Sequence, residues 1–559
     1  KLLSALSACS SFQSAYLNRA DAARWLGAAS PEMRLSEEER RLVAAAGWPL
    51  HLLEDPQRMP RVVTSAAEFV RELLIGEYLE DFVVLPQGTT LLGLSENEAL
   101  PQWLPTALDA AGPSVLEFLR CIDSNVLETH KAALEYVDDW GVQREAMPKP
   151  YPFCLWELPE AAPSDPSCSL PEFWRSLRQR LATVEVMVKR GEVDAERLYV
   201  CEMRHMRERD SNPGAAAAGD NWRTKSLSLR HVRDVLGKDA RWTLYWNCYD
   251  DGLFVGGKGS GKGAHVDQVL WSNVGKQWRG LKLVATWPAG SVSAKIVSEL
   301  GDAQFSLPLG TKQRAALEEC ARVVLLRPGD VFLMSGGVAH TTLSISEELT
   351  VTAYESLVTL NPRHVAHFLH TGDTCGPGAL DRGVMEAGDL LDLRTGVAEQ
   401  LVNLLRIEAG PGIPCRKQVS DFSAGKNAPD LHKELHALLY SAAKMLSTNR
   451  SYATLLPPDL PSLLAALELK VPAARRAELL SAQIAAGADA AAEDASERSA
   501  KRQRSLAHSK VDLASSLPCQ SQSSSSSSTS SSSSDSPSAS VEEDVQAVES
   551  HVSVDELAE

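Results

Sequence analysis

The chain has 559 residues, too many for one compact hydrophobic core, so we expect two or more folded units. Hydrophobic residues make up 44% and charged residues 23%, as in ordinary globular proteins. The net charge of −17 argues against a protein that binds nucleic acid non-specifically, because such binding needs clustered Lys and Arg. No apolar run approaches the ~20 residues of a membrane-spanning helix, so we predict no membrane span.

Ten cysteines are scattered through the chain, and none forms a C-x-x-C pair. This pattern argues against zinc fingers, zinc ribbons and thioredoxin-like redox chemistry. Unpaired cysteines are typical of reducing compartments, so we predict an intracellular protein of the nucleus or cytoplasm. Because the chain begins at Lys1 rather than Met, a targeting signal can precede it.

Residues 1–200 are predicted to be mostly helical. Apolar residues recur at helical spacing in three segments, 65–77, 105–140 and 170–189. Residues 82–94 differ, since two short β-rich stretches flank a Pro-Gln-Gly turn and predict a pair of strands. Residues 148–171 are rich in proline and are predicted to form a loop.

Residues 201–362 are predicted to form a β domain, with a barrel core at about 240–360. Short β-rich segments separated by Gly, Pro and Asp are found at 242–249, 265–271, 281–287, 322–326, 331–334 and 349–358. This pattern is typical of a jelly-roll or cupin-like barrel or sandwich. Helical spacing returns over residues 363–482, so the fold class that we predict is α+β.

Residues 483–559 are predicted to be a disordered, serine-rich and acidic tail. Residues 521–540 contain fifteen serines, and residues 535–559 contain eight acidic side chains without Lys or Arg. Such segments cannot bury enough apolar surface to fold. The basic cluster Lys501–Arg504 lies in this tail, and both solvated charge and a nuclear-import signal remain open interpretations.

Two histidines and one aspartate are the strongest candidates for a functional site. His265 and Asp267 are two residues apart in a predicted strand, and this spacing places both side chains on one face. His340 comes from a distant segment, after a Pro-Gly-Asp turn. Together they are the ligand set of a mononuclear non-haem iron site, which keeps coordination positions open for oxygen chemistry. Each residue alone is more often an ordinary structural one, so the prediction depends on the combination.

Lys282 is a candidate for binding an anionic cosubstrate. It follows Asp267 by fifteen residues and lies in the next predicted strand. A buried ammonium group needs an anionic partner, which the distal carboxylate of a dicarboxylic cosubstrate would supply. The alternative is a lysine whose stem packs while its charged end reaches solvent.

The order of these motifs resembles the JmjC-type 2-oxoglutarate oxygenases over residues 240–360. The shared pattern is His-x-Asp, then Asn273, then Gly-x-Lys-x-x-x-x-Trp-Pro at Gly280–Pro288, then Pro-Gly-Asp-Val-Phe and a final His. The resemblance implies a double-stranded β-helix, flanked by helical regions and followed by the disordered tail. It also implies an Fe(II) site made of His265, Asp267 and His340.

The resemblance extends to residues that would bind the cosubstrate. It implies that Lys282 holds the C5 carboxylate of 2-oxoglutarate and that Asn273 lies near it. Members of the family often have Thr or Ser three residues before the first histidine, where this chain has Lys262. Ser260 and Tyr245 are the candidates to replace that contact.

The implied activity consumes Fe(II)-bound O2 and 2-oxoglutarate and hydroxylates a side chain of a protein or peptide, with succinate and carbon dioxide as products. Demethylation of a histone or another N-methylated protein is the alternative within the family. A catalytically inactive cupin-like module that only binds a partner is the alternative of another class. The sequence does not decide the substrate or the oligomeric state.

Other motifs are interpreted as structural. Gly256–Lys262 matches the first part of a P-loop, but Gly263 replaces the Ser or Thr and a predicted strand replaces the following helix. We therefore interpret the glycines as allowing close approach of the backbone to a ligand. Lys433 stands where a zinc-protease motif needs Glu, which argues against that motif at His432 and His436. Packing or surface roles are predicted for His364, His367 and His370.

Overall fold

The computed structural model divides the chain into two units, Lys1–Ser499 and Ala500–Glu559, and all the residues that it describes lie in the first unit. The described residues are 33–80, 82–94, 100, 102–121, 130–137, 143–145, 185–186, 188–191, 194–205, 231–247, 252–267, 271–288, 291–300, 309–369, 387–409, 428–448 and 456–481. The predicted proline-rich loop, most of the predicted helix 170–189 and the whole tail with its basic cluster lie outside these residues. The boundaries of the helical and β regions remain predictions.

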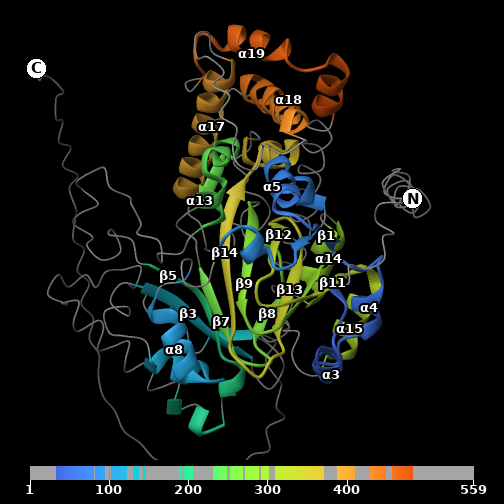
Figure 1. Ribbon diagram of the computed structural model, residues 1–559, viewed down its shortest axis with the longest axis vertical. Helices are drawn as coiled ribbons and strands as arrows, with labels where there is room; N and C mark the ends of the chain where they lie inside the picture. Colours follow the sequence, from blue (N-terminus) through green and yellow to red (C-terminus); the bar gives the residue numbers. More distant parts are fainter. Residues whose placement is uncertain are drawn as a thin grey trace, which may run out of the picture. The chain divides into compact units, whose positions relative to one another are not determined.

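The strands of the described residues form two sheets (Figure 1). The larger sheet has the order β1-β2-β12-β9-β14-β7-β5-β3-β4, and β6 also pairs with β14. Its strands are β1 (Arg61–Val62), β2 (Val83–Leu85), β3 (His130–Val137), β4 (Gln143–Glu145), β5 (Tyr199–His205), β6 (Tyr245–Asn247), β7 (Leu253–Gly256), β9 (Ser272–Arg279), β12 (Val331–Ser335) and β14 (Thr350–Val358). The smaller sheet, in the order β11-β10-β13-β8, consists of β8 (Gly261–His265), β10 (Lys282–Thr286), β11 (Arg322–Leu326) and β13 (His340–Ser344).

From β7 to β14 the chain crosses repeatedly between the two sheets. β7, β9, β12 and β14 lie in the larger sheet, whereas β8, β10, β11 and β13 form the smaller one. The pairings among these strands are antiparallel. The predicted α+β class is therefore confirmed, while the double-stranded β-helix stays a prediction.

Side chains from both sheets meet in one apolar cluster. Phe332 of β12 packs there with Val284 of β10 and Val324 of β11. Phe332 also stacks on Phe82, with ring centroids 5.2 Å apart. Alternate residues of a strand share a face, so the face of β10 that carries Val284 also carries Lys282. The space between the sheets therefore holds a charged side chain beside its apolar cluster.

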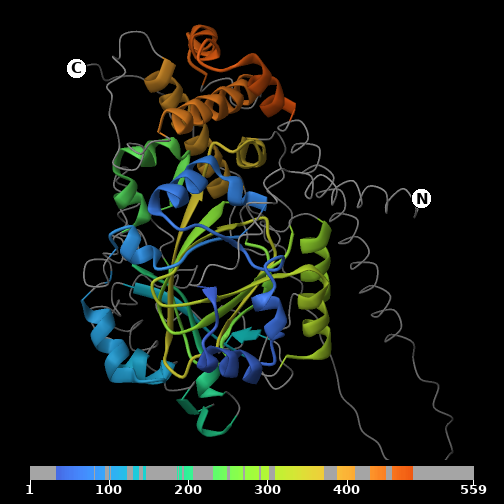
Figure 2. The ribbon, with the colours of Figure 1, turned by 45° about the vertical axis from the view of Figure 1, so that its right-hand side comes forward.

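Helices cover the outer faces of the two sheets. The apolar cluster behind the larger sheet includes α5 (Ala66–Ile75), α8 (Trp103–Ala111), α9 (Val115–Cys121), α13 (Val232–Leu236), α16 (Pro362–Leu369), α17 (Ala387–Ala409), α18 (Ala428–Thr448) and α19 (Leu460–Glu468). The cluster behind the smaller sheet includes α3 (Glu37–Ala45), α4 (Leu50–Glu54), α14 (Ser291–Leu300) and α15 (Thr311–Cys320). The helices α16 to α19 contact one another and lie together near one end of the strands (Figure 2).

Shorter helical segments connect these elements. They are α6 (Gly88–Leu91) and the 3-10 helices η2 (Glu77–Glu80), η3 (Ala195–Arg197) and η5 (Gly237–Trp242). Within the described part of the chain, no helix has the length and apolarity needed to cross a membrane.

The predicted helix at 65–77 is confirmed as α5. Ser65 begins it, and its Oγ accepts a hydrogen bond from the Glu68 backbone N–H at 3.2 Å. Gly76 ends it in the left-handed conformation, with φ of 74°. The apolar side chains between these two residues are buried against the larger sheet.

Two predictions for the N-terminal region are wrong in part. Residues 82–94 form only one strand, because Gly88–Leu91 turns into the short helix α6. Gly88 lies so close to Val331 that a Cβ on it would be 2.7 Å from the valine Cβ, which favours a compact turn there. Within 105–140, the described residues are helical in α8 and α9, whereas 130–137 is the strand β3. Strand β5 also begins inside the region predicted to be helical, at Tyr199.

Candidate metal centre

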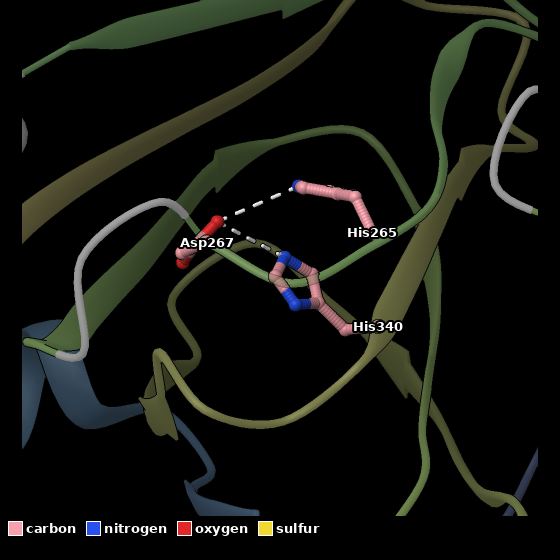
Figure 3. A group of neighbouring side chains, drawn as sticks. All are labelled: His265, Asp267 and His340. Carbon is pink, nitrogen blue, oxygen red and sulfur yellow. Dashed lines mark ion pairs between the residues drawn. The ribbon is translucent and has the colours of Figure 1, made fainter. Parts of the chain in front are cut away.

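His265, Asp267 and His340 come together although they lie on different segments (Figure 3). His265 is the last residue of β8 and is paired with His340, the first residue of β13. Asp267 lies two residues beyond β8, so the prediction that it shares a strand with His265 is wrong. The strand ends at His265 rather than beginning there, and the Asp267 carboxylate beyond its end lies near both imidazoles.

The donor atoms of these three residues converge. One ligand atom from each lies within 4.8 Å of the others. Asp267 Oδ1 is 3.5 Å from His265 Nε2 and 3.7 Å from His340 Nε2. The two imidazole rings have centroids 4.2 Å apart. Two imidazole nitrogens and a carboxylate oxygen around one point can hold a metal ion.

Both histidines present the nitrogen that a metal needs. His265 Nδ1 is 2.8 Å from the Gly263 carbonyl oxygen, and His340 Nδ1 is 3.1 Å from that of Val338. A carbonyl only accepts, so Nδ1 carries the proton in each ring and Nε2 keeps its lone pair. Burial, together with the neighbouring His265, lowers the pKa of His340 to about 4 against the opposing effect of Asp267. His340 is therefore neutral near pH 7, which is the form that binds metal.

Asp267 is held in its ionised form by its neighbours. Burial opposes ionisation, but His340, His265 and a hydrogen bond from Asn273 together lower its pKa. Asn273 Nδ2 donates to Asp267 Oδ2 at 2.5 Å, and Asn273 Oδ1 accepts from Ser356 Oγ at 2.9 Å. The structure thus places Asn273 directly behind the carboxylate, where it fixes the orientation of Asp267.

Lys282 is fully buried, so its charged end does not reach solvent. Its Nζ donates to Thr352 Oγ1 at 2.7 Å and to Tyr199 OH at 3.3 Å. Burial lowers the pKa of Lys282 to about 7, although Cys201 nearby opposes the shift. Among the described residues, no carboxylate forms an ion pair with it. The ammonium group therefore lies in a polar setting that an incoming anion would complete.

The lysine and the metal ligands face the same interior space. In the pairing of β10 with β13, Lys282 is opposite Ser344 and Thr286 is opposite His340. Paired residues share a face, and so do alternate residues of one strand, which places Lys282 and His340 on the same side. Ser344 Oγ is buried on that side without a hydrogen-bond partner. Its hydroxyl is thus available to a ligand beside the lysine.

The other two predicted cosubstrate contacts have protein partners of their own, and the Ser260 carbonyl accepts from the Ser344 N–H at 2.8 Å. Ser260 is buried in the turn between β7 and β8, where its Oγ donates to the Gly257 carbonyl at 2.7 Å. Tyr245 lies in β6 and stacks on Trp271, with ring centroids 6.1 Å apart. Tyr199, Thr352 and Ser344 line the lysine instead. Ser344 follows His340 by four residues, so it could have been predicted to share a face with this histidine. Nothing in the sequence indicates that Tyr199 lies beside Lys282.

The glycine-rich segment has a structural role. It connects β7 to β8 without the helix that a P-loop requires. A Cβ on Gly261 would be 2.0 Å from the Thr342 carbonyl oxygen, so β8 approaches β13 too closely for any side chain there. The backbone of Gly261 therefore lies close to a neighbouring strand, whereas the sequence analysis predicted that the glycines lie close to a ligand.

The remaining histidines have packing roles where the structure describes them. His364 Nδ1 accepts from the Thr359 N–H at 3.0 Å, and its Nε2 is 2.8 Å from Ser272 Oγ. His436 Nε2 is 3.0 Å from Glu408. The side chain of His367 and the whole of His370 lie outside the described residues.

Comparisons with known proteins add little. No family model matches the chain, and none of the curated proteins matches it. Among solved structures, YcfD, a ribosomal oxygenase from Escherichia coli, is similar at 13% sequence identity and a TM-score of 0.24. That similarity covers 61% of this chain and 68% of YcfD.

Proposed function

We propose that the chain is an Fe(II)- and 2-oxoglutarate-dependent dioxygenase that hydroxylates a side chain of a protein or peptide. One observation supports this most. A carboxylate and two imidazole Nε2 atoms converge, and a buried lysine lies on the same interior face. Three such ligands suit divalent iron and leave coordination positions open. We further propose that β7 to β14 form a double-stranded β-helix.

His265, Asp267 and His340 would hold the metal ion, and Lys282 would bind the C5 carboxylate of 2-oxoglutarate. When bound, Fe(II) supplies O2 activation coupled to decarboxylation of 2-oxoglutarate to succinate, with hydroxylation of a substrate C–H bond. The chain itself has to position these groups and keep water away from them.

The surroundings of Lys282 suit a carboxylate. Its ammonium group and the hydroxyls of Tyr199 and Ser344 can donate hydrogen bonds to it, whereas Thr352 Oγ1 accepts from the lysine and donates to Gln277 Oε1 at 2.8 Å. A carboxylate accepts several such bonds, and the charge of the lysine would be neutralised on binding. Asn273 donates a hydrogen bond to Asp267, and Ser356 donates one to Asn273. The Asp267 carboxylate is therefore oriented before a metal ion binds.

The test is turnover of 2-oxoglutarate to succinate with added Fe(II). We expect His265→Ala to abolish turnover and Lys282→Ala to raise the KM for 2-oxoglutarate sharply. His432→Ala removes a histidine outside the site and should keep wild-type turnover. Unchanged turnover in His265→Ala would refute the assignment of this ligand.

The outcome also separates the alternatives. A protein that takes up no metal and stays inert on peptide panels would favour a cupin-like binding module. For an active protein, mass spectrometry of substrate captured by the His265→Ala variant distinguishes the two chemistries. An added oxygen supports hydroxylation, whereas loss of methyl groups supports demethylation.

A further inference from the structure

The buried His364 does more than pack against its neighbours. It lies in α16, and only 3% of it is exposed. Its Nδ1 accepts a hydrogen bond from the Thr359 N–H at 3.0 Å, and its Nε2 is 2.8 Å from Ser272 Oγ. A backbone N–H only donates, so Nδ1 keeps its lone pair and Nε2 carries the proton. His364 therefore donates to Ser272, the first residue of β9.

Ser272 and Asn273 point to opposite faces of β9, because successive residues of a strand do so. Asn273 faces the interior, where its amide donates to Asp267. Ser272 consequently faces the outer side of the sheet, where His364 contacts it. The histidine and the metal ligand thus lie on opposite sides of one strand, and two neighbouring residues of that strand connect them.

Ser272 also lies at the end of the hydrogen-bonded part of β9. It is paired with Ser335 of β12 and with Leu357 of β14, and both pairs are the last in their ladders. The ends of elements open more readily than their centres. Opening at this end would displace Asn273, the next residue, and with it the carboxylate that Asn273 orients. The hydrogen bond from His364 opposes such opening.

His364 is itself fixed by the connection between β14 and α16. Thr359 Oγ1 accepts from the Asn361 N–H at 3.1 Å, and Asn361 Nδ2 donates to the Gly76 carbonyl at 3.0 Å. A Cβ on Gly76 would be 2.5 Å from Thr359 Oγ1, so the end of α5 lies directly against this connection. The imidazole is therefore held on one side by the connection and on the other by β9.

We propose that His364 is a positioning residue for the metal centre and acts on Asp267 through Ser272 and Asn273. The inference rests on the proposed function and adds to it a control of metal affinity from the outer face of the sheet. Because α16 contacts α17 and α18, the same path connects the helical cluster to the metal centre.

The affinity of the full chain for Mn(II), measured by titration, tests the role of His364. The amide of His364→Asn overlaps Nδ1, so it keeps the contact with Thr359 but is too short to reach Ser272. We expect Mn(II) to bind about fivefold more weakly, a smaller loss than for Asn273→Ala because the histidine acts from one residue further away. Equal affinity in wild type and His364→Asn would refute the proposal.

The conservative variant His364→Gln should restore most of the affinity. Its amide nitrogen extends to the position of Nε2, so it can donate to Ser272. If the Gln and Asn variants weaken Mn(II) binding equally, the contact with Ser272 is not the cause and the proposal is wrong.

A double-variant cycle tests the path through Ser272. Ser272→Ala removes the acceptor and should weaken Mn(II) binding by about the same factor as His364→Asn. Both substitutions together should weaken it no further, since each removes the same hydrogen bond. Losses that multiply in the double variant would show that the two residues act independently, which would overturn the path.

Val365→Ala separates positioning from a loss of stability. Val365 is buried in the same helix and packs in the apolar cluster behind the larger sheet. Its truncation destabilises α16 but leaves the hydrogen bond of His364 in place, so Mn(II) affinity should equal that of the wild type. Urea denaturation measures the stability of each variant. A loss of affinity as large as in His364→Asn, at equal stability, would make the role of His364 merely structural.

Failure of the proposed function gives a different result. If the wild type binds no Mn(II), the metal centre itself is refuted, and the proposed function fails together with this inference. If the wild type binds Mn(II) and His364→Asn binds it equally well, only the positioning role fails.

Discussion

Lys282 is expected to couple the proposed binding of an anion to uptake of a proton. Its pKa is lowered to about 7 by burial, so at pH 8 most of the lysine is uncharged. A carboxylate beside it would restore the charged form, and 2-oxoglutarate binding should take up about one proton at that pH. Calorimetry in buffers of different ionisation enthalpy measures this uptake, and Lys282→Met should abolish it.

The same lysine sets a pH dependence of stability in the protein without cosubstrate. Between about 7 and the ordinary value of 10.5, the unfolded chain binds more protons than the folded one. The free energy of unfolding should therefore rise with pH across this window. Urea denaturation at several pH values checks it, and a profile that Lys282→Met leaves unchanged would contradict the assignment.

Asn273 is expected to act on the metal through Asp267. Its amide donates to the carboxylate and is itself fixed by Ser356. Asn273→Ala should weaken metal binding about tenfold, because the carboxylate loses its orientation. Titration with Mn(II) measures the affinity. Ser356→Ala should have a smaller effect, and equal metal binding in wild type and Asn273→Ala would exclude this role.

At the scale of elements, one buried ion pair holds four segments together. Lys276 of β9 contacts Glu355 of β14, and both side chains are fully buried. Glu355 also accepts from Trp246 Nε1 of β6 and from the Val232 N–H of α13, at 2.9 and 2.8 Å. Burial opposes ionisation of Glu355, but Lys276, His231 and the hydrogen bond from the Val232 N–H outweigh it and lower the pKa of Glu355.

Lys276→Met should lower the free energy of unfolding by about 3–5 kcal/mol, since it leaves a buried carboxylate unpaired. Adding Glu355→Gln should recover part of the loss, because a neutral amide oxygen still accepts from Val232 and Trp246. Urea denaturation of both variants checks this. A double variant less stable than Lys276→Met would show that the carboxylate is stabilised without the lysine.

The sequence predicts some of these strands and misses others for a physical reason. The apolar strands at 322–326, 331–334 and 349–358 are buried on both faces and are easily recognised. β9 and β13 are rich in polar side chains, and these include Asn273 and His340, which face the site. Their composition lacks the apolar pattern of a strand, and they were not predicted. The grouping of His265, Asp267 and His340 was predicted, because it depends on residue type and order rather than on an apolar pattern.

On the scale of the whole molecule, Glu408 joins the helical cluster to the β region. From α17 it contacts His436 of α18 at 3.0 Å and Arg241 of η5 at 3.1 Å. These partners outweigh burial and lower the pKa of Glu408. A residue that bridges three segments can only be found from the structure, since nothing in the local sequence marks it.

Glu408→Gln should weaken the contact of α17 with α18 and η5 by about 1–3 kcal/mol, because the hydrogen bonds lose their charged acceptor. Hydrogen exchange should then increase in α17 and α18 and remain unchanged in β10 and β13. Glu399→Gln, which changes an exposed carboxylate of the same helix, is the control. Uniformly faster exchange would point to global destabilisation instead.

Gly261 is expected to influence which ion size the proposed metal site accepts. Because it allows β8 to lie against the Thr342 carbonyl, it fixes the separation of two strands that each contribute a histidine. Gly261→Ala should push these strands apart and favour ions of larger radius, so the ratio of Mn(II) to Zn(II) affinity should increase. Competition titration measures that ratio. Ion selectivity here would then be a property of main-chain spacing, controlled by a residue that has no donor atom in its side chain.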